Sequence, residues 1–172
     1  MRYAWVGMML ALGLAAPATA QDGQKATASF IDGQGKTIGS ATLIQTPNGV
    51  LITLDLKGIP AGEHAFHVHE KGVCNAADKF MSAGGHYNPG RKQHGYLTAG
   101  GTHAGDMPNQ FVGADGVLKA NVLNEQVTLG SGTGTLFGGD GTALVLHAKG
   151  DDYKSQPAGD AGGRIACAVV KK

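Results

Sequence analysis

The chain has 172 residues with 14 basic and 13 acidic side chains, so its formal net charge at pH 7 is +1. This length fits one domain with a sizeable core and is short for two. The near balance of charge, with no basic patch, argues against a nucleic-acid-binding protein.

Residues 1–20, MRYAWVGMMLALGLAAPATA, have the pattern of a secretory signal peptide. An arginine is followed by an apolar run, and the segment ends in Ala18-Thr19-Ala20, which matches the small-residue site of signal peptidase. The run is too short for a comfortable membrane span, and no later segment is apolar enough to be one. We therefore expect an exported domain over residues 21–172, with 13 basic and 13 acidic residues once Arg2 is removed. The alternative is an uncleaved N-terminal anchor.

Short segments in which apolar and polar residues alternate predict β-strands along the mature chain. The candidate strands are residues 26–32, 37–45, 50–58, 65–69, 116–123, 142–148 and 164–170. Glycine, with 29 residues, separates them in turns such as Asp32-Gly33-Gln34-Gly35. No segment has the pattern of an amphipathic helix. The sequence therefore predicts an all-β, single-domain antiparallel β-sandwich or barrel.

Two long stretches, residues 72–110 and 150–163, fit no strand. Structureless loops of that length are uncommon in compact domains and are usually functional. We therefore expect the functional site in these loops.

Six of the seven histidines fall within a span of forty residues. The histidines are His64, His67, His69, His86, His94, His103 and His147. His67 and His69 stand two apart on a candidate strand, so their side chains leave the same face and one metal ion could take both. Two packed or surface histidines are the alternative for this pair. His147 lies in an apolar strand, where a lone histidine is more often a satisfied core residue. With His67 and His69 it would complete a set of imidazoles suited to copper(II).

The loop "AGGHYNPGRKQHGYLTAGGTHAGDMPN" supplies His86, His94, His103 and Asp106. Three imidazoles and one carboxylate form a closed tetrahedral set for zinc, with no position left for water. Such a structural metal site could stand in for the hydrophobic core that this loop lacks. A solvated loop with incidental histidines is the alternative.

The chain has two cysteines, Cys74 and Cys167. An even number of cysteines in an exported protein predicts a disulfide, and two buried free thiols are the alternative.

The motifs "GEHAFHVHE", "AGGHYNPGRKQHG", "HAGDMPN", "LVLHAKGDD" and "AGGRIAC" resemble, in this order, those of copper/zinc superoxide dismutase of the bacterial periplasmic type. The spacing of His86, His94, His103 and Asp106 matches the metal loop of that family. The resemblance implies a Greek-key β-barrel with a metal-binding loop and an active-site channel loop. It also implies a periplasmic enzyme that converts superoxide to oxygen and hydrogen peroxide and protects against extracytoplasmic superoxide.

The resemblance implies one copper ion and one zinc ion per chain, joined by His86. Copper would be held by His67, His69, His86 and His147, and zinc by His86, His94, His103 and Asp106. Three further roles follow from the same match. Asp151 would link one histidine of each metal, Arg164 would attract the substrate beside the copper, and Cys74 would pair with Cys167. His64 matches a buried histidine that is not a ligand.

The sequence departs from the family at Tyr96-Leu97, where Gly-Pro is more usual, and at Ala168, where glycine is usual. The segment 151–163 carries few charges, which leaves the strength of substrate steering open. Whether the chain is a monomer or a homodimer is also open. Rival functions are a metal store or carrier, an inactive dismutase-like domain and a hydrolytic zinc enzyme. The first would more often use methionine or thiolate ligands, the second would lack ligands, and the third needs an open zinc position.

Overall fold

The computed structural model describes residues 23–172, so the predicted leader at residues 1–20 lies outside the described part. Within residues 23–172 the chain forms nine strands and two 3₁₀ turns. The strands are β1 (Lys25–Asp32), β2 (Thr37–Thr46), β3 (Gly49–Lys57), β4 (Gly62–His64), β5 (Phe66–His69), β6 (Gln110–Val112), β7 (Val117–Asn124), β8 (Ala143–His147) and β9 (Arg164–Val169). The 3₁₀ turns are η1 (Ala76–Asp78) and η2 (Met81–Ala83). No helix among these residues is long and apolar enough to cross a membrane.

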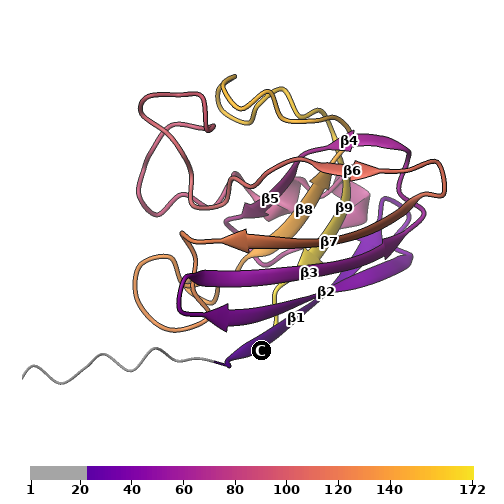
Figure 1. The fold of residues 1–172 in the computed structure, drawn as a ribbon. Helices are drawn as coiled ribbons and strands as arrows, with labels where there is room; N and C mark the ends of the chain where they lie inside the picture. The colour runs from indigo at the N-terminus through magenta and orange to yellow at the C-terminus, as the bar shows by residue number, and fades with distance from the viewer. Residues whose placement is uncertain (1–22) are drawn as a thin grey trace, which may run out of the picture.

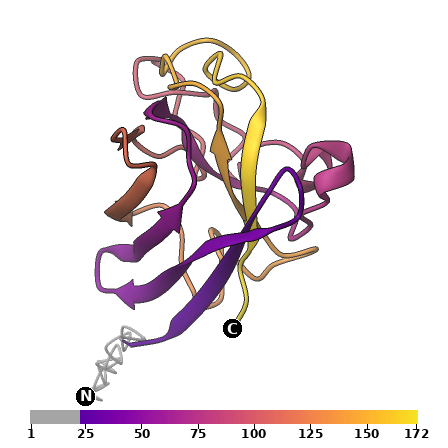
Figure 2. The same ribbon diagram turned by 90° about the vertical axis from the view of Figure 1, so that its right-hand side faces the viewer.

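Seven strands form one antiparallel sheet in the order β5-β8-β9-β1-β2-β3-β7, and β4 pairs with β6 in a second, two-stranded sheet. The large sheet curls so that β1, β2, β3 and β7 face β5, β8 and β9 across the interior (Figures 1 and 2). The all-β, single-domain antiparallel fold predicted from the strand pattern is confirmed.

The alternation that predicted the strands places their apolar side chains in the core. On β1, Ala26, Ala28 and Phe30 are buried and the residues between them are exposed. β8 differs because all five of its residues are buried. Phe66 and Val68 of β5 belong to the main hydrophobic cluster. Because successive side chains alternate across a strand, His67 and His69 point away from that cluster.

The sequence pattern missed the small sheet. β4 and β6 have three residues each, and in β6 the outward side chain is Phe111, which is 74% exposed. A strand of three residues is too short to show an alternating pattern of apolar and polar residues. The candidate strand over residues 65–69 begins at Phe66, because Ala65 separates β4 from β5.

The two long loops lie together at one end of the barrel, shown in pink and in yellow-orange in Figures 1 and 2. Backbone hydrogen bonds join them, for example from Leu97 N–H to the carbonyl of Tyr153 at 3.0 Å. Gly95 is required at this contact, since it has φ +97° and an added Cβ would overlap the Tyr153 carbonyl.

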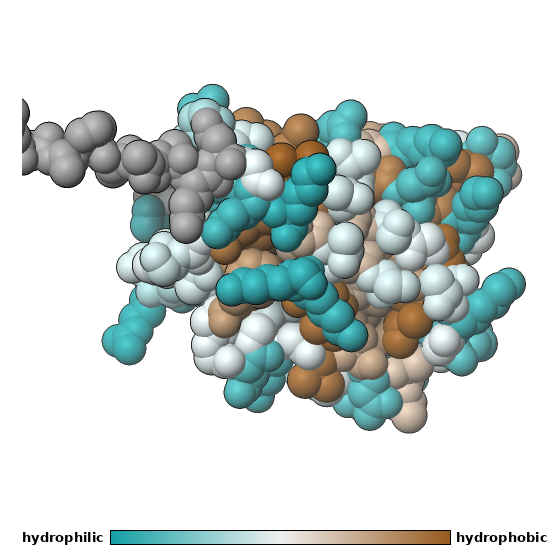
Figure 3. All heavy atoms as spheres, turned by 90° about the horizontal axis from the view of Figure 1, so that it is seen from below, coloured by the Kyte–Doolittle hydropathy of each residue, from teal (hydrophilic) through white to brown (hydrophobic). Residues whose placement is uncertain are grey.

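The face in Figure 3 shows hydrophobic residues scattered among hydrophilic ones, as on an ordinary solvent-exposed surface.

Candidate metal centre

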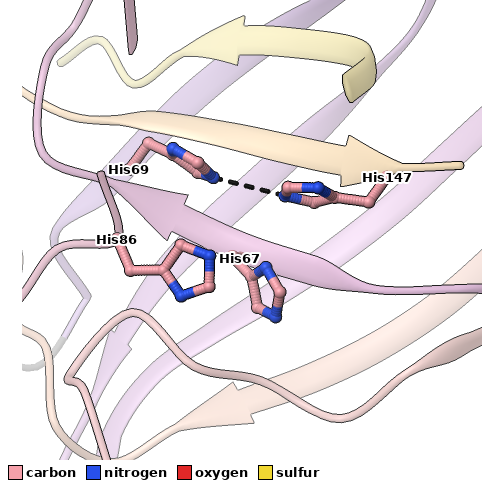
Figure 4. A group of neighbouring side chains, drawn as sticks. All are labelled: His67, His69, His86 and His147. Atoms are coloured by element: carbon pink, nitrogen blue, oxygen red, sulfur yellow. Dashed lines mark hydrogen bonds between the residues drawn. The ribbon is translucent and has the colours of Figure 1, made fainter. Parts of the chain in front are cut away.

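Two neighbouring strands position three of the predicted copper ligands. His67 and His69 lie on β5, and His147 ends β8, which pairs with β5 in antiparallel register. The register of β8 against β9 shifts between Leu146 and His147. The fourth histidine, His86, comes from the long loop and bridges to His69 through the backbone. Figure 4 shows these four rings converging on one region.

One ring nitrogen of each of His67, His69, His86 and His147 lies within 4.8 Å of the others, and all four residues are buried. Hydrogen bonds assign which nitrogen is free. His69 donates from Nδ1 to the Gly84 carbonyl at 3.0 Å, and Nδ1 of His147 lies 3.5 Å from the Gly162 carbonyl. Their Nε2 atoms then face each other at 3.3 Å, along the dashed line in Figure 4. Nδ1 of His67 is buried with no partner.

Burial keeps this first set neutral. It holds the pKa of His69 well below the ordinary value and lowers the pKa of His147 to about 2, with repulsion from neighbouring histidines adding to the effect. A neutral imidazole offers a lone pair, which is the form that binds a metal ion. Several converging imidazoles are a donor set suited to copper.

The second set surrounds one oxygen of Asp106. Oδ1 of this carboxylate lies 2.8 Å from His86 Nδ1, 3.0 Å from His94 Nδ1 and 3.2 Å from His103 Nδ1. Burial acts to raise the pKa of Asp106, but hydrogen bonds from His103, His86 and His94 outweigh it and hold the pKa well below its usual range. The carboxylate is therefore ionised at neutral pH. Three imidazoles and a carboxylate are a closed tetrahedral set of the kind that binds structural zinc.

His86 belongs to both sets. Its Nδ1 lies in the Asp106 set, and its Nε2 is buried on the other side of the ring without any partner. The ring centroid of His86 lies 4.0 Å from that of His67. Burial, opposed by the Asp106 hydrogen bond, lowers the pKa of His86 to about 4. A neutral ring with one nitrogen aimed at each set is placed to connect two metal ions.

Asp151 connects the two sets by a second route. Its Oδ2 accepts from His67 Nε2 at 2.8 Å, and its Oδ1 accepts from His94 Nε2 at 3.0 Å. Burial lowers the pKa of His94, but hydrogen bonds to Asp106 and Asp151 outweigh it and raise the pKa to about 9. A positive charge is thus favoured between His94 and Asp106, and a metal cation fits the same position. Both sets, with the orphaned nitrogens of His67 and His86, fit the copper and zinc ions that the sequence predicts.

The structure adds two residues that the sequence pattern did not single out. The side chain of Asn109 accepts from Asp151 N–H at 2.8 Å and donates to the Asp151 carbonyl at 2.9 Å. Gln156 makes the same pair of bonds, both at 2.9 Å, with the backbone of His94. Asparagine and glutamine have no fixed spacing to such partners, so only the fold reveals these contacts.

Arg164 lies at the edge of a cavity of about 440 Å³ that His69, His86 and His147 also line. Its Nη1 donates to the Phe80 carbonyl and its Nη2 to the Gly84 carbonyl, both at 2.6 Å. These bonds hold the planar group in one orientation, and a guanidinium has five N–H donors, so further donors remain. Lys79 is the other cationic side chain that lines the cavity. Burial lowers the pKa of Arg164, which still leaves it charged at neutral pH.

The predicted disulfide is confirmed. Cys74 and Cys167 are bonded, with Cα atoms 5.7 Å apart and a sequence separation of 93 residues. The bond ties the start of the long loop to β9, the strand that begins at Arg164. In the chain-entropy account, closing a loop of this length restricts the unfolded chain by up to about 4–5 kcal/mol.

His64 stands outside both sets. It is buried, and its two ring nitrogens lie 2.7 Å from the His147 carbonyl and 2.8 Å from the Pro60 carbonyl. It supports the backbone at His147 instead of offering a free nitrogen.

A curled antiparallel barrel that carries two joined sets of metal-binding side chains at its loop end defines a β-barrel protein with a binuclear metal centre. Residues 37–170 match the family described as copper/zinc superoxide dismutase. The chain is 52% identical to superoxide dismutase [Cu-Zn] 2 of Aquifex aeolicus over 149 residues, which cover 86% of each chain. It is 44% identical to superoxide dismutase [Cu-Zn] of Caulobacter vibrioides, with 85% of each chain covered.

Solved structures agree with these relatives. A double mutant of a superoxide dismutase-like protein from Bacillus subtilis superposes with a TM-score of 0.82 at 34% identity, covering 85% of this chain and 97% of that one. The Cu/Zn superoxide dismutase from Brucella abortus superposes with a TM-score of 0.70 at 28% identity, covering 86% and 100%. The chain belongs to the copper/zinc superoxide dismutase family.

Proposed function

We propose that this chain binds one copper ion and one zinc ion and catalyses the dismutation of superoxide. Two superoxide anions and two protons give one oxygen and one hydrogen peroxide. The observation that carries the proposal is the placement of His86, whose two ring nitrogens face the two ligand sets. Copper would be held by His67, His69, His86 and His147, and zinc by His86, His94, His103 and Asp106.

When bound, copper supplies the electron exchange, because it alternates between two oxidation states and zinc does not. His86 holds and releases a proton at Nε2, the atom that faces the first set. Its Nδ1 stays in the Asp106 set, so the ring keeps its orientation while Nε2 takes up and releases the proton. Asp151 fixes His67 and His94 through their Nε2–H groups, and such outer hydrogen bonds orient metal-binding rings.

Arg164 attracts and orients the substrate. Its guanidinium is cationic and is held by the Phe80 and Gly84 carbonyls. It lines the same cavity as three histidines of the first set. A fixed planar cation with free N–H donors suits a small anion, since it needs no reorganisation when the anion arrives.

The leader pattern at residues 1–20 and the disulfide support export to the periplasm, where the enzyme would remove extracytoplasmic superoxide. A purified mature protein that begins at Gln21 would establish the domain boundary. A homodimer remains a prediction that sedimentation of the mature protein would test.

The rivals differ from this proposal in features of the two sets. The zinc set has four donors and leaves no open position for a hydrolytic water. Neither set lacks a ligand, as an inactive dismutase-like domain would. A metal store needs no cationic group fixed at the edge of the cavity.

The experiment is metal analysis together with superoxide consumption by the purified mature protein. We expect one copper, one zinc and rapid turnover. His147→Ala should reduce turnover to background and retain zinc, because His147 belongs only to the first set. Protein that holds both metals without consuming superoxide would instead be a store, and full activity in the His147 variant would refute the copper assignment.

A further inference from the structure

The carboxylate of Asp106 has one oxygen among the histidines and one oxygen that faces away from them. The second oxygen, Oδ2, accepts three hydrogen bonds. They come from Gly95 N–H at 2.9 Å, His103 N–H at 3.0 Å and the Thr102 hydroxyl at 2.7 Å. Thr102 is the shortest of the three contacts and the one made by a side chain, so a substitution can remove it.

The Thr102 hydroxyl has one proton and two acceptors within reach. The His103 carbonyl lies at 3.4 Å, which is long for a hydroxyl donor, whereas the ionised Asp106 oxygen lies at 2.7 Å. Hydrogen bonds to a charged acceptor are shorter and stronger, so the Thr102 hydroxyl donates its hydrogen bond to Asp106 and not to the His103 carbonyl.

We infer that Thr102 is a positioning residue that makes Asp106 a one-oxygen ligand for zinc. This inference rests on the zinc set of the proposed function and names a side chain outside that set. A carboxylate oxygen offers about two lone pairs, and the three donors at Oδ2 compete with a metal ion for them. Oδ1 is then the remaining ligand atom, and with three imidazoles it gives four-coordinate geometry.

Burial makes the Thr102 contact hard to replace. Asp106 is 3% exposed, so water has little access to Oδ2 once the hydroxyl is gone. An ionised oxygen that has lost one donor in a buried site is drawn toward the nearest cation. In a Thr102 variant that cation is the metal ion, so Oδ2 would turn toward it and the coordination number would rise above four.

Tyr96 supplies a matched control. Its hydroxyl donates to the backbone carbonyl of Asp106 at 2.9 Å, and its ring packs against Tyr153 with centroids 5.4 Å apart. Tyr96→Phe therefore removes a hydrogen bond to Asp106 without changing the contacts of either carboxylate oxygen. A purely structural effect on the loop should appear in both variants, and an effect through Oδ2 should appear in Thr102→Val alone.

The experiment compares the full mature chain with T102V, T102S and Y96F. Metal-free protein is titrated with Zn²⁺ against a chromophoric chelator, and then with Co²⁺, whose visible absorption is stronger in four-coordinate than in five-coordinate sites. The Co²⁺ bands that count are those that one equivalent of Zn²⁺ removes. We expect T102V to raise the zinc Kd by about 10- to 100-fold and weaken the Co²⁺ bands. T102S restores the hydroxyl and should restore both readouts, while Y96F should leave the bands unchanged.

An unchanged zinc Kd and Co²⁺ spectrum in T102V would overturn the inference. Equal losses in T102V and T102S, or in T102V and Y96F, would overturn it too, because they would show that the loop and not the hydroxyl matters. If T102V is unstable, T102A with circular dichroism before and after zinc gives the same comparison. The proposed function fails separately: wild-type protein with both metals would then not consume superoxide, and the zinc and Co²⁺ titrations would still decide the role of Thr102.

Discussion

His69 and His147 face each other through their Nε2 atoms at 3.3 Å, although each ring has its Nδ1 directed at a backbone carbonyl. The Nδ1–H groups are committed to Gly84 and Gly162, so both facing atoms carry lone pairs when the rings are neutral. Burial keeps them neutral, with depressed pKa values for both. Two lone pairs at this distance repel unless a cation lies between them, so the fold is completed by the metal ion.

Removing the metals should therefore lower the stability of the barrel. A ligand that binds only the folded state stabilises it by about 4 kcal/mol when its concentration is 1,000 times its Kd. We expect chelation to lower Tm and addition of Cu²⁺ and Zn²⁺ to restore it. Scanning calorimetry measures both changes. The same Tm in chelated and metal-loaded protein would mean that neither set contributes to stability.

Asp151→Asn should weaken both sets at once. Asp151 accepts from His67 and His94, and an asparagine side chain has only one acceptor oxygen for two N–H donors. We expect the affinity for copper and for zinc each to fall by about 10- to 100-fold, measured by chelator competition.

Asp152→Asn is the matched control, because this neighbouring carboxylate accepts only from Lys154 and Ser155. Its affinities should equal those of the wild type. Loss of one metal alone in Asp151→Asn would contradict the idea that this carboxylate connects the two sets.

Much of the site could be predicted from the sequence because its ligands stand at fixed spacings. His67 and His69 share a strand face, and the loop spacing of His86, His94, His103 and Asp106 is specific enough to indicate a family. The strands were predictable for the same reason, since burial on one face leaves alternation in the sequence.

The contacts that support the ligands were not predictable. Thr102 acts through a hydrogen bond within the metal-binding loop, and Asn109 and Gln156 each make a pair of hydrogen bonds between the two long loops. A threonine or an amide at such a position has no distinctive pattern around it. Lys79 is a similar case, because its place beside the cavity depends on a backbone in the left-handed region, with φ 57°. The short strands β4 and β6 were not predicted, because three residues are too few to show the alternation of a strand.

The metal-free protein should lose stability as the pH falls below neutrality. Burial and neighbouring charges lower the pKa of His147 to about 2, and burial lowers that of His86 to about 4, both from 6.5. Between these values and 6.5 the unfolded chain binds protons that the folded chain does not, so stability present above pH 6.5 decreases toward acid. Each histidine contributes up to about 1.4 kcal/mol per pH unit in its window.

His94 acts in the opposite direction. Its raised pKa of about 9 gives stability that is present below pH 6.5 and is lost as the pH rises through 9. We expect Tm of chelated protein to fall from pH 7 to pH 5 and also from pH 7 to pH 9. His147→Gln should flatten the acid side only. A Tm that rises between pH 7 and pH 5 would show that the buried histidines are not neutral.

Substrate attraction should depend on Arg164 and Lys79, because these two cations line the cavity beside the first set. Focused electric fields raise association rates by about 10- to 1000-fold, this enzyme family being among the known examples. Arg164→Glu reverses the charge that the Phe80 and Gly84 carbonyls hold in place, and it should slow turnover strongly with both metals retained. Lys79→Glu should have a smaller effect, because the Lys79 side chain is exposed and no hydrogen bond among the described residues holds its amine in place.

Lys154→Glu is the charge-matched control, since Lys154 lies in the second loop and does not line the cavity. All three variants change the net charge by the same amount, so a difference among them reports position and not total charge. The wild-type rate should fall as salt rises, because the Debye length shrinks from about 10 Å at 0.1 M to about 3 Å at 1 M. In Arg164→Glu the salt dependence should flatten or reverse. Pulse radiolysis at several ionic strengths measures these rates, and equal rates with equal salt dependence in the Arg164 and Lys154 variants would remove Arg164 from the mechanism.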